Sequence, residues 1–419
     1  MKKNLFFVLA ICFLVGKINA QTTSIIEGII IDAKTNSPLE KVNIFNQTST
    51  LGGFSNLEGT FQLEIKEYPS VIIFSYVGYE NFLLKLNQKP TGSITINLQP
   101  SSFGLPEVEI TAQPKIEKLT NRSFTVKDFL LVDDKILILT FADVFSGNKL
   151  ILQNWQGELL DELPLKKVKV NSLHQGCLGS IHLLGKSHGY EISIIENKIL
   201  LLVKYPKKQF TKLIEPCVES SKDFIYRQRY TGQNQILTYQ IVSKKEKNIL
   251  TTLRVIDELN LRRSKDDHVL QRQIGIPLPL TWAQVQAWNS LMYKPLYSPL
   301  VNMGEELCLF NHTIGYLEFT TFKGKSKRYT PITYHQSKKW HQQIFFDKKN
   351  NKVYTAFNTK KGKTIHRIDL AKGTTEPVLF LECTFVEKMV IEGGYLFYLE
   401  SGKIHSERNR ILQKVKLDE

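Results

Sequence analysis

The sequence predicts an all-β protein, with an N-terminal antiparallel sandwich followed by a larger all-β domain that is best described as a β-propeller of about six blades. Two observations predict this, and a third marks an exception. Short β-rich runs separated by turn residues fill residues 24–112. Polar turns followed by apolar runs recur through residues 121–419, the later ones at the forty-odd residues typical of a four-stranded blade. One segment, residues 255–300, interrupts this rhythm.

The first twenty residues have the layout of a secretory signal. Lys2 and Lys3 precede an apolar run over residues 5–15, and a small-residue exit ends at Ala20. A positive start, a short apolar stretch and a small residue at the cut are typical of a cleaved signal peptide, and the stretch is short for a membrane span. We therefore expect residues 1–20 to be a signal peptide that is cut after Ala20, and the mature chain to be exported.

The chain is basic, with a formal net charge of +15. The expected signal carries Lys2, Lys3 and Lys17, so the mature chain keeps +12 (15 − 3). This surplus favours an anionic membrane surface or an acidic partner. The competing interpretation is a generally basic surface without a dedicated partner, because runs such as residues 244–247 mix both signs. Export disfavours nucleic acid as a partner.

The cysteines leave two interpretations open. A lipoprotein signal ending at Cys12 is disfavoured because Ile11 is bulky at that position. Removal of the signal peptide takes Cys12 with it and leaves four cysteines. This is an even number, and the compartment outside the cytoplasm permits disulfides. The spacing of the four matches no metal knuckle. Apolar neighbours, as in residues 307–309, favour buried free thiols as much as bridges. The four are Cys177, Cys217, Cys308 and Cys383.

The N-terminal segment contains a full set of strands for a small sandwich. We expect strands at residues 25–32, 39–44, 60–65 and 71–80. Turn residues separate them, at residues 35–38, 52–53 and 56–59.

Residues 21–112 resemble the carboxypeptidase-regulatory-like domain, a transthyretin-like sandwich common at the start of outer-membrane proteins of Bacteroidetes. Residues 105–112 further resemble the segment that closes this domain in TonB-dependent receptors. The resemblance implies a place in the periplasm or at the periphery of the outer membrane. We expect residues 113–120 to be a linker. The matching elements are residues 28–32, 37–39 leading into 42–44, 58–61 and 74–79.

The family's name suggests zinc peptidase chemistry, which the residues do not support. His188 and Glu191 have metal-ligand spacing and could be completed by His312, but a chain with nine histidines offers such a pair by chance. The sequence also has no nucleophile elbow, phosphate loop or His-Glu-x-x-His motif. We expect no catalytic residue, no metal and no cofactor.

Five polar turns followed by apolar runs suggest the blades of the second domain. The C-terminal part resembles a six-bladed propeller only weakly, and a large sandwich or two stacked β domains is the alternative. The five instances are residues 133–139, 196–202, 304–310, 350–356 and 392–398.

The segment 255–300 concentrates aromatic residues where a loop would be polar. Thr281 is positioned to cap a short helix over residues 282–289. Such a segment either seals the propeller, as aromatics at helical spacing commonly do, or binds a partner, since Trp, Tyr and Arg dominate binding hot spots. The residues of the hypothetical partner surface are Arg262, Arg263, Trp282, Trp288, Tyr293 and Tyr297.

Together these observations predict a non-catalytic envelope protein with a binding or scaffolding role in an outer-membrane-associated assembly. Its expected partner is another envelope protein or a cell-surface glycan, with peripheral contact to the outer membrane. The alternative is a glycan-active or glycan-binding propeller enzyme, because propellers can bring carboxylates together from separate blades in a way that linear spacing does not reveal.

Overall fold

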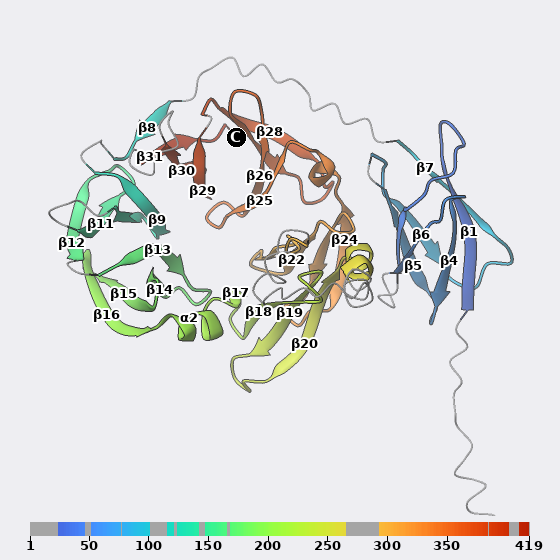
Figure 1. Cartoon of the computed structure of the whole chain (residues 1–419), viewed down its shortest axis with the longest axis horizontal. Coiled ribbons are helices and arrows are strands. Elements are labelled where there is room, and N and C mark those ends of the chain that lie inside the picture. Colours follow the sequence, from blue (N-terminus) through green and yellow to red (C-terminus); the bar gives the residue numbers. More distant parts are fainter. Residues whose placement is uncertain are drawn as a thin grey trace, which may run out of the picture. The chain divides into compact units, whose positions relative to one another are not determined.

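A computed structural model of the protein shows two compact units, Met1–Phe103 and Gly104–Glu419, both built of β-strands (Figure 1). The structure describes residues 24–46, 52–76, 78–100, 115–120, 124–141, 147–165, 168–264, 293–383, 385–401 and 410–418.

The N-terminal unit is a sandwich of a three-stranded and a four-stranded sheet, with strand orders β4-β1-β7 and β3-β2-β5-β6. Alternate side chains of both sheets point inward and form one apolar core, which includes Ile30, Leu63 and Phe74. The strands are β1 (Ser24–Asp32), β2 (Asn43–Asn46), β3 (Gly52–Phe54), β4 (Thr60–Ile65), β5 (Ser70–Ser75), β6 (Phe82–Leu86) and β7 (Ile94–Leu98).

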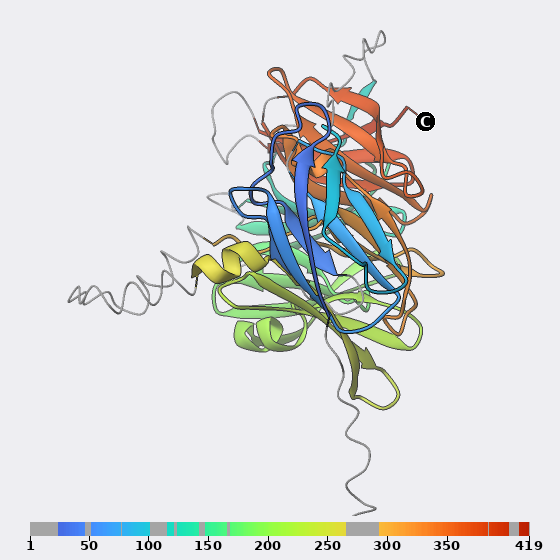
Figure 2. The same cartoon turned by 90° about the vertical axis from the view of Figure 1, so that its right-hand side faces the viewer.

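One strand pair departs from the expected antiparallel sandwich. Strand β1 pairs with β4 in antiparallel fashion but with β7 in parallel, as the matching arrow directions in Figure 2 show. Gly28 lies at the start of the parallel pairing, opposite Ile94. A Cβ atom at this position would lie 2.3 Å from the Ile94 carbonyl oxygen and 2.5 Å from the Phe61 ring. Only glycine therefore allows the two strands to approach here.

Two of the segments that carry the family resemblance meet at Asp32. Its carboxylate accepts hydrogen bonds from the backbone N–H groups of Lys34 (2.7 Å) and Thr35 (3.0 Å) and from the Tyr79 hydroxyl (2.6 Å). The bond from Tyr79 contributes most to lowering the pKa of Asp32, and the same bond raises the pKa of Tyr79 to about 12. The neighbouring Gly78 has φ +87°, the left-handed conformation that favours glycine.

The predicted strands of the sandwich need three corrections. The strand expected at residues 39–44 begins at residue 43, because Lys41 has a positive φ of 61° that breaks the extended chain. The strand expected at 71–80 ends at Ser75. Residues 52–53, expected as a break, belong to the short edge strand β3. The strand at 60–65 is confirmed.

The C-terminal unit is a ring of six four-stranded antiparallel sheets, which confirms the predicted six-bladed propeller (Figure 1). Blade 1 contains β9 (Val126–Val132), β10 (Lys135–Thr140), β11 (Asn148–Asn154) and β12 (Leu159–Leu165). Blade 2 contains β13 (Val170–Gln175), β14 (Ile181–Gly185), β15 (His188–Ile195) and β16 (Lys198–Pro206). Blade 3 contains β17 (Cys217–Ser220), β18 (Phe224–Thr231), β19 (Ile236–Ser243) and β20 (Ile249–Ile256). Blade 4 contains β21 (Leu300–Asn302), β22 (Leu307–Asn311), β23 (Tyr316–Thr320) and β24 (Ser326–Pro331). Blade 5 contains β25 (Trp340–Asp347), β26 (Lys352–Asn358), β27 (Lys363–Ile368) and β28 (Thr375–Leu381). Blade 6 contains β29 (Val386–Glu392), β30 (Tyr395–Ser401), β31 (Arg410–Lys416) and β8 (Ile116–Lys118).

The ring closes through a strand from the other end of the unit. Strand β8 pairs with β31 as the fourth strand of blade 6, and the Leu119 N–H donates to the Leu412 carbonyl at 2.9 Å. The predicted linker at residues 113–120 is therefore wrong for its second half. Residues 116–118 are part of the propeller, where a short strand with few apolar residues gave no sequence signal.

Apolar clusters fill the junctions of blades 1–2, 3–4, 4–5, 5–6 and 6–1. The junction of blades 2 and 3 is held by a disulfide between Cys177 and Cys217, by the Ser220 hydroxyl on the Cys177 carbonyl (2.7 Å), and by the short helix α2 (Lys207–Leu213). Cys308 and Cys383 are free and buried. The sequence left bridges and buried free thiols open. Cys177 and Cys217 form a bridge, and Cys308 and Cys383 are buried free thiols.

The five runs used to count blades lie at two different places in the sheets. Residues 135–139, 307–310, 352–356 and 395–398 lie in β10, β22, β26 and β30, the second strands of blades 1, 4, 5 and 6. Residues 198–202 instead begin β16, the fourth strand of blade 2. Blades 2 and 3 were therefore not resolved by the repeat, although the total of six was correct.

Candidate functional site

The connections between strands differ sharply between the two faces of the propeller. Antiparallel neighbours reverse direction at each step, so connections after the first and third strands lie on one face and those after the second and fourth on the other. The first face carries tight turns such as residues 133–134 and 196–197. The second carries residues 207–216, 257–299 and 332–339. We call these the short-turn face and the long-connection face.

The interruption predicted at residues 255–300 is the largest of these connections. Strand β20 runs to Ile256, and residues 258–264 form a helix whose start is capped by Asp257, which accepts the Asn260 N–H at 2.9 Å (yellow in Figure 1). Arg262 and Arg263 are exposed on this helix. The helix expected after Thr281 and the two tryptophans, Trp282 and Trp288, lie outside the described residues.

The two tyrosines of the hypothetical partner surface are packed into the propeller. Tyr293 is only 7% exposed. Tyr297 stacks on His312 with ring centroids 5.6 Å apart, and its hydroxyl accepts the Ile344 N–H at 2.7 Å. Both side chains therefore have the sealing role that was the alternative to partner binding. The six-residue surface as a whole stays a prediction, and of its described members only Arg262 and Arg263 are exposed.

The residues of the zinc hypothesis are not brought together. His188 begins β15 in blade 2, where it is exposed and hydrogen-bonds Ser187 at 2.9 Å. His312 lies in blade 4, with Nδ1 2.8 Å from the Tyr297 carbonyl oxygen and Nε2 2.9 Å from the Tyr334 hydroxyl. Both ring nitrogens are thus occupied, which leaves no lone pair for a metal. Across the described residues, no group of three His, Cys, Asp or Glu has metal-site geometry.

His312 lies in an aromatic and histidine cluster between blades 4 and 5. Its neighbours include Tyr334, His335 and Trp340, all within 6 Å between ring centroids. Burial lowers the pKa of His312 to about 3 and that of His335 to about 4. Such histidines are neutral at physiological pH, so they serve packing and hydrogen bonding rather than proton transfer.

The glycan-active alternative rested on carboxylates contributed from separate blades, which linear spacing does not reveal, and the inner strands are one place where they could meet. In the described part of these strands each carboxylate is engaged. Asp128 binds Lys388, Asp347 accepts the N–H groups of Gly393 and Gly394, and Glu387 pairs with Arg410. Glu219 and Glu392 accept backbone N–H groups. The contacts of Asp128, Asp347 and Glu392 join neighbouring blades, whereas the Glu387–Arg410 pair lies within blade 6.

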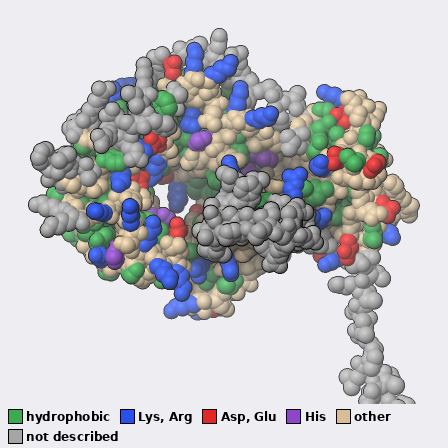
Figure 3. All heavy atoms as spheres, viewed as in Figure 1, with side chains coloured by type: hydrophobic (Ala, Val, Ile, Leu, Met, Phe, Trp, Pro, Cys, Tyr) green, Lys and Arg blue, Asp and Glu red, His purple; other side chains and the backbone are tan. Residues whose placement is uncertain are grey.

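A basic depression on blade 2 was not predicted. It has a volume of about 610 Å³ and lies where the β14–β15 connection meets α2 (Figure 3). Only Phe210 of α2 is buried, so the rest of this short helix faces outward. The lysines stand apart in the sequence, at 186 and from 207 onward, so no charge run predicted the cluster. The depression is lined by Lys186, Ser187, Lys207, Lys208, Thr211 and Lys212.

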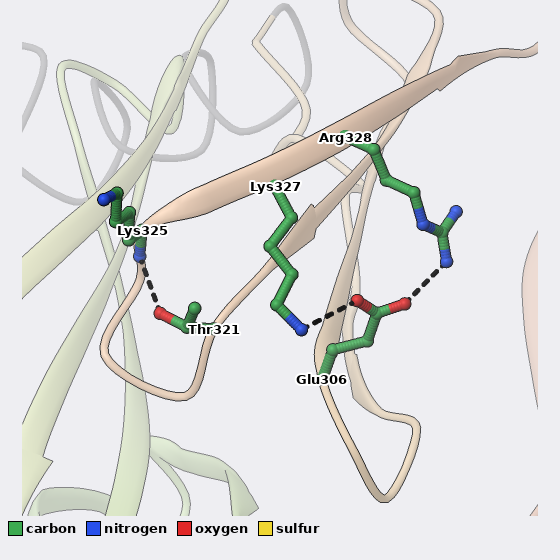
Figure 4. Close-up of polar contacts among 5 residues, drawn as sticks. All are labelled: Glu306, Thr321, Lys325, Lys327 and Arg328. Carbon is green, nitrogen blue, oxygen red and sulfur yellow. Dashed lines mark hydrogen bonds and ion pairs between the residues drawn. The ribbon is translucent and has the colours of Figure 1, made fainter.

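Some basic residues elsewhere are paired with carboxylates, whereas these lysines are not. In blade 4, Glu306 binds Lys327 Nζ at 3.3 Å and Arg328 at 2.6 Å (Figure 4). In the part of the chain that the structure describes, none of the four lysines of the depression has a carboxylate within 4.0 Å. The depression is therefore an unneutralised positive surface.

The comparisons with known proteins support the two units unequally. Residues 26–110 match the CarboxypepD_reg-like domain family. The N-terminal sandwich is therefore a carboxypeptidase-regulatory-like domain, as its resemblance predicted. That match covers about a fifth of the chain, and no curated protein matches the sequence.

Solved structures similar to the chain include a propeller domain and a peptidase from two Pyrococcus species. The β-propeller domain of the trilobed protease from Pyrococcus furiosus is 8% identical, with a TM-score of 0.35, and the match covers 71% of this chain and 94% of that one. The acylaminoacyl peptidase from Pyrococcus horikoshii is 8% identical, with a TM-score of 0.30 and coverage of 66% and 43%. The chain thus spans less than half of that peptidase. Likeness at this distance carries no functional argument, and the propeller assignment rests on the strand pairing.

Among the residues that the structure describes, no helix combines the length and apolarity needed to cross a bilayer.

Proposed function

We propose that the protein is an exported, non-catalytic envelope protein that binds or scaffolds a partner through the long-connection face of its propeller. The observation that carries the proposal is the asymmetry of the two faces. Loops on a rigid β scaffold are the usual place for binding groups, and here the long connections gather on one face while tight turns cover the other.

Three further observations support the proposal. The carboxypeptidase-regulatory-like domain at residues 26–110 accompanies the propeller as a second compact unit, an arrangement suited to scaffolding. The Cys177–Cys217 disulfide is typical of an oxidising compartment, which agrees with export. The described inner-strand carboxylates are bound to neighbouring groups, which favours a binding protein over a glycan-cleaving enzyme.

The binding face can be tested by site-specific photocrosslinking in the native host. We would place the crosslinker at the exposed positions Arg263 and Lys338 on the long-connection face, and at Lys245 and Lys323 on the short-turn face as matched controls. Discrete adducts at the first pair alone are expected. Equal labelling of both faces, or none at either, would contradict the proposed face. Mass spectrometry of the purified N-terminus tests export separately, with Gln21 as the expected first residue.

A further inference from the structure

Blade 2 exposes more large apolar side chains than the other blades. Of the ten exposed large hydrophobic residues in the described part of the propeller, six belong to blade 2 and α2. Three of them are close in sequence to residues that line the basic depression: Leu202 and Val203 near the end of β16, 50% and 61% exposed, and Leu213 at the end of α2, 55% exposed. Strand β16 is also the outer strand of its blade, and within the described residues no strand pairs with its second edge.

Leu213 directly follows Lys212 in the chain, and Leu202 and Val203 precede Lys207 by five and four residues. Val203 is followed by Lys204, and the strand leads through Pro206 into Lys207 at the start of α2. The Lys207 N–H donates to the Ser187 carbonyl at 2.8 Å, which holds the helix against the β14–β15 connection and so brings Lys186 into the same depression. We call Lys186, Leu202, Val203, Lys207, Lys208, Lys212 and Leu213 the blade 2 edge.

The composition of the blade 2 edge distinguishes between classes of partner. Protein interfaces are enriched in Trp, Tyr and Arg and depleted in lysine. The residues that define the blade 2 edge are leucine, valine and lysine, and Arg227 borders them, donating to the Lys212 carbonyl at 3.2 Å. A small soluble anion would use the lysines but would leave the exposed leucines without a role. Lysines beside leucines are instead typical of segments that lie in the interface of an anionic membrane.

We propose that the blade 2 edge seats the propeller on an anionic lipid bilayer. The lysines and the hydroxyls of Ser187 and Thr211 face the lipid phosphates, while Leu202 and Leu213 enter the boundary between headgroups and acyl chains. Because α2 is anchored through the single buried residue Phe210, its other side chains are free to contact lipid. This inference rests on the proposed envelope location and adds the membrane as a partner of a defined surface.

Vesicle sedimentation with the purified exported protein tests the proposal. We expect the protein to sediment with vesicles of phosphatidylglycerol and phosphatidylcholine in equal parts, and to stay in solution with phosphatidylcholine alone. Added salt should weaken binding, because it screens the lysine–phosphate attraction. Lys→Ser at 186, 207, 208 and 212 together should lower the partition coefficient more than a hundredfold, at about fivefold for each lysine. Leu202→Ser with Leu213→Ser should lower it at least tenfold.

Two matched control variants separate the blade 2 edge from general effects of charge and apolarity. Lys→Ser at 222, 245, 323 and 325 removes the same charge from exposed positions on the short-turn face, where the contact that Figure 4 draws for Lys325 comes from its backbone N–H to Thr321. Ile249→Ser with Leu250→Ser removes exposed apolar side chains from the outer strand of blade 3. Both controls should bind vesicles as the parent protein does.

Each other outcome would overturn the proposal. Equal losses in the lysine variant and its control would mean non-specific attraction of a basic protein. Competition by inorganic phosphate, beyond that of chloride at the same ionic strength, would mean a soluble-anion site. Loss in the lysine variant but not in the leucine variant would also exclude membrane insertion. Because purified protein is used, failure of vesicle binding leaves the partner-binding face and the export test unaffected.

Discussion

Lys388 Nζ lies 2.6 Å from Oδ1 of Asp128, joining the inner strands of blades 6 and 1 across 260 residues of sequence. The other carboxylate oxygen of Asp128 accepts the Leu173 N–H of blade 2 at 2.7 Å. A single carboxylate therefore connects three blades at the point where the first and last blades meet. The same ammonium group also donates to the Phe129 carbonyl at 2.6 Å.

Replacing Lys388 by methionine should lower the free energy of unfolding by about 2 kcal/mol, because a largely buried carboxylate loses its charged partner. The same change in an Asp128→Asn background should cost about 0.5 kcal/mol, since the amide needs no counter-charge. Urea unfolding of the four proteins measures the coupling. Arg367→Met is the control, because it breaks a well-exposed pair with Glu376 and should change little. If Lys388→Met cost the same free energy of unfolding in both backgrounds, the ion pair would not help to close the ring of blades.

The Cys177–Cys217 disulfide closes a loop with a sequence separation of 40 at the junction of blades 2 and 3. Replacing both cysteines by serine should lower the free energy of unfolding by about 4 kcal/mol, mainly because the unfolded chain gains freedom. Thermal melts with and without reductant measure this effect. Reductant should destabilise the parent protein by a similar amount and leave the double variant unchanged. A double variant that still responds to reductant would point to another bridge.

The sequence allowed the all-β class and the regulatory-like domain to be predicted, because these depend on local patterns. The total of six blades was also correct, although the repeat did not resolve blades 2 and 3. Alternation in residues 60–65 and the turn residues beside it determine a strand directly. The parallel pairing of β1 with β7 could not be predicted, because it depends on the close approach at Gly28, about 66 residues from its partner Ile94. Strand β8 escaped prediction for a similar reason, since its partner β31 lies at the far end of the chain.

The candidate site was harder to predict than the fold. Aromatic residues such as Tyr293 and Tyr297 suit both a core and a binding surface, and burial, which the sequence does not show, distinguishes the two roles. The basic depression went unnoticed because Lys186 and Lys207 meet only after the β15–β16 hairpin folds. The absence of a neutralising carboxylate, which gives these lysines their interest, is a property of three-dimensional structure alone.

Gly28→Ala should destabilise the N-terminal sandwich by about 2–3 kcal/mol, because the added methyl group would overlap the Ile94 carbonyl oxygen and the Phe61 ring. Gly53→Ala is the matched control in the other sheet, where the nearest atom to an added Cβ is 3.6 Å away. That change should be neutral or slightly stabilising. Hydrogen exchange of residues 24–100 in the full chain measures both, and faster exchange in the control alone would contradict the role of Gly28.

Buried histidines should make the propeller acid-sensitive over a defined range. The native pKa of His312 is about 3 and that of His366 about 4, both lowered by burial, whereas an unfolded histidine has a pKa of about 6.5. Below about pH 6.5 the unfolded chain therefore binds protons that the native state does not, so stability is complete above this value and falls as the pH drops towards 4. Each such histidine contributes a loss of about 1.4 kcal/mol for each pH unit in that range.

His312→Asn removes one of the histidines that bind a proton in the unfolded chain but not in the native state. Nδ1–H of His312 donates to the Tyr297 carbonyl and Nε2 accepts from Tyr334, so the asparagine amide replaces the first bond and leaves the Tyr334 hydroxyl without its acceptor. We expect the variant to be about 1–3 kcal/mol less stable near neutral pH, because a buried hydroxyl loses its hydrogen bond. Its stability should also fall less steeply with acid, by about one proton. Urea unfolding at several pH values between about 7 and 5 gives both quantities from one series, and the pH slope separates protonation from packing. If stability fell with acid as steeply in the variant as in the parent protein, His312 would bind its proton as readily in the native state as in the unfolded chain, in conflict with its burial.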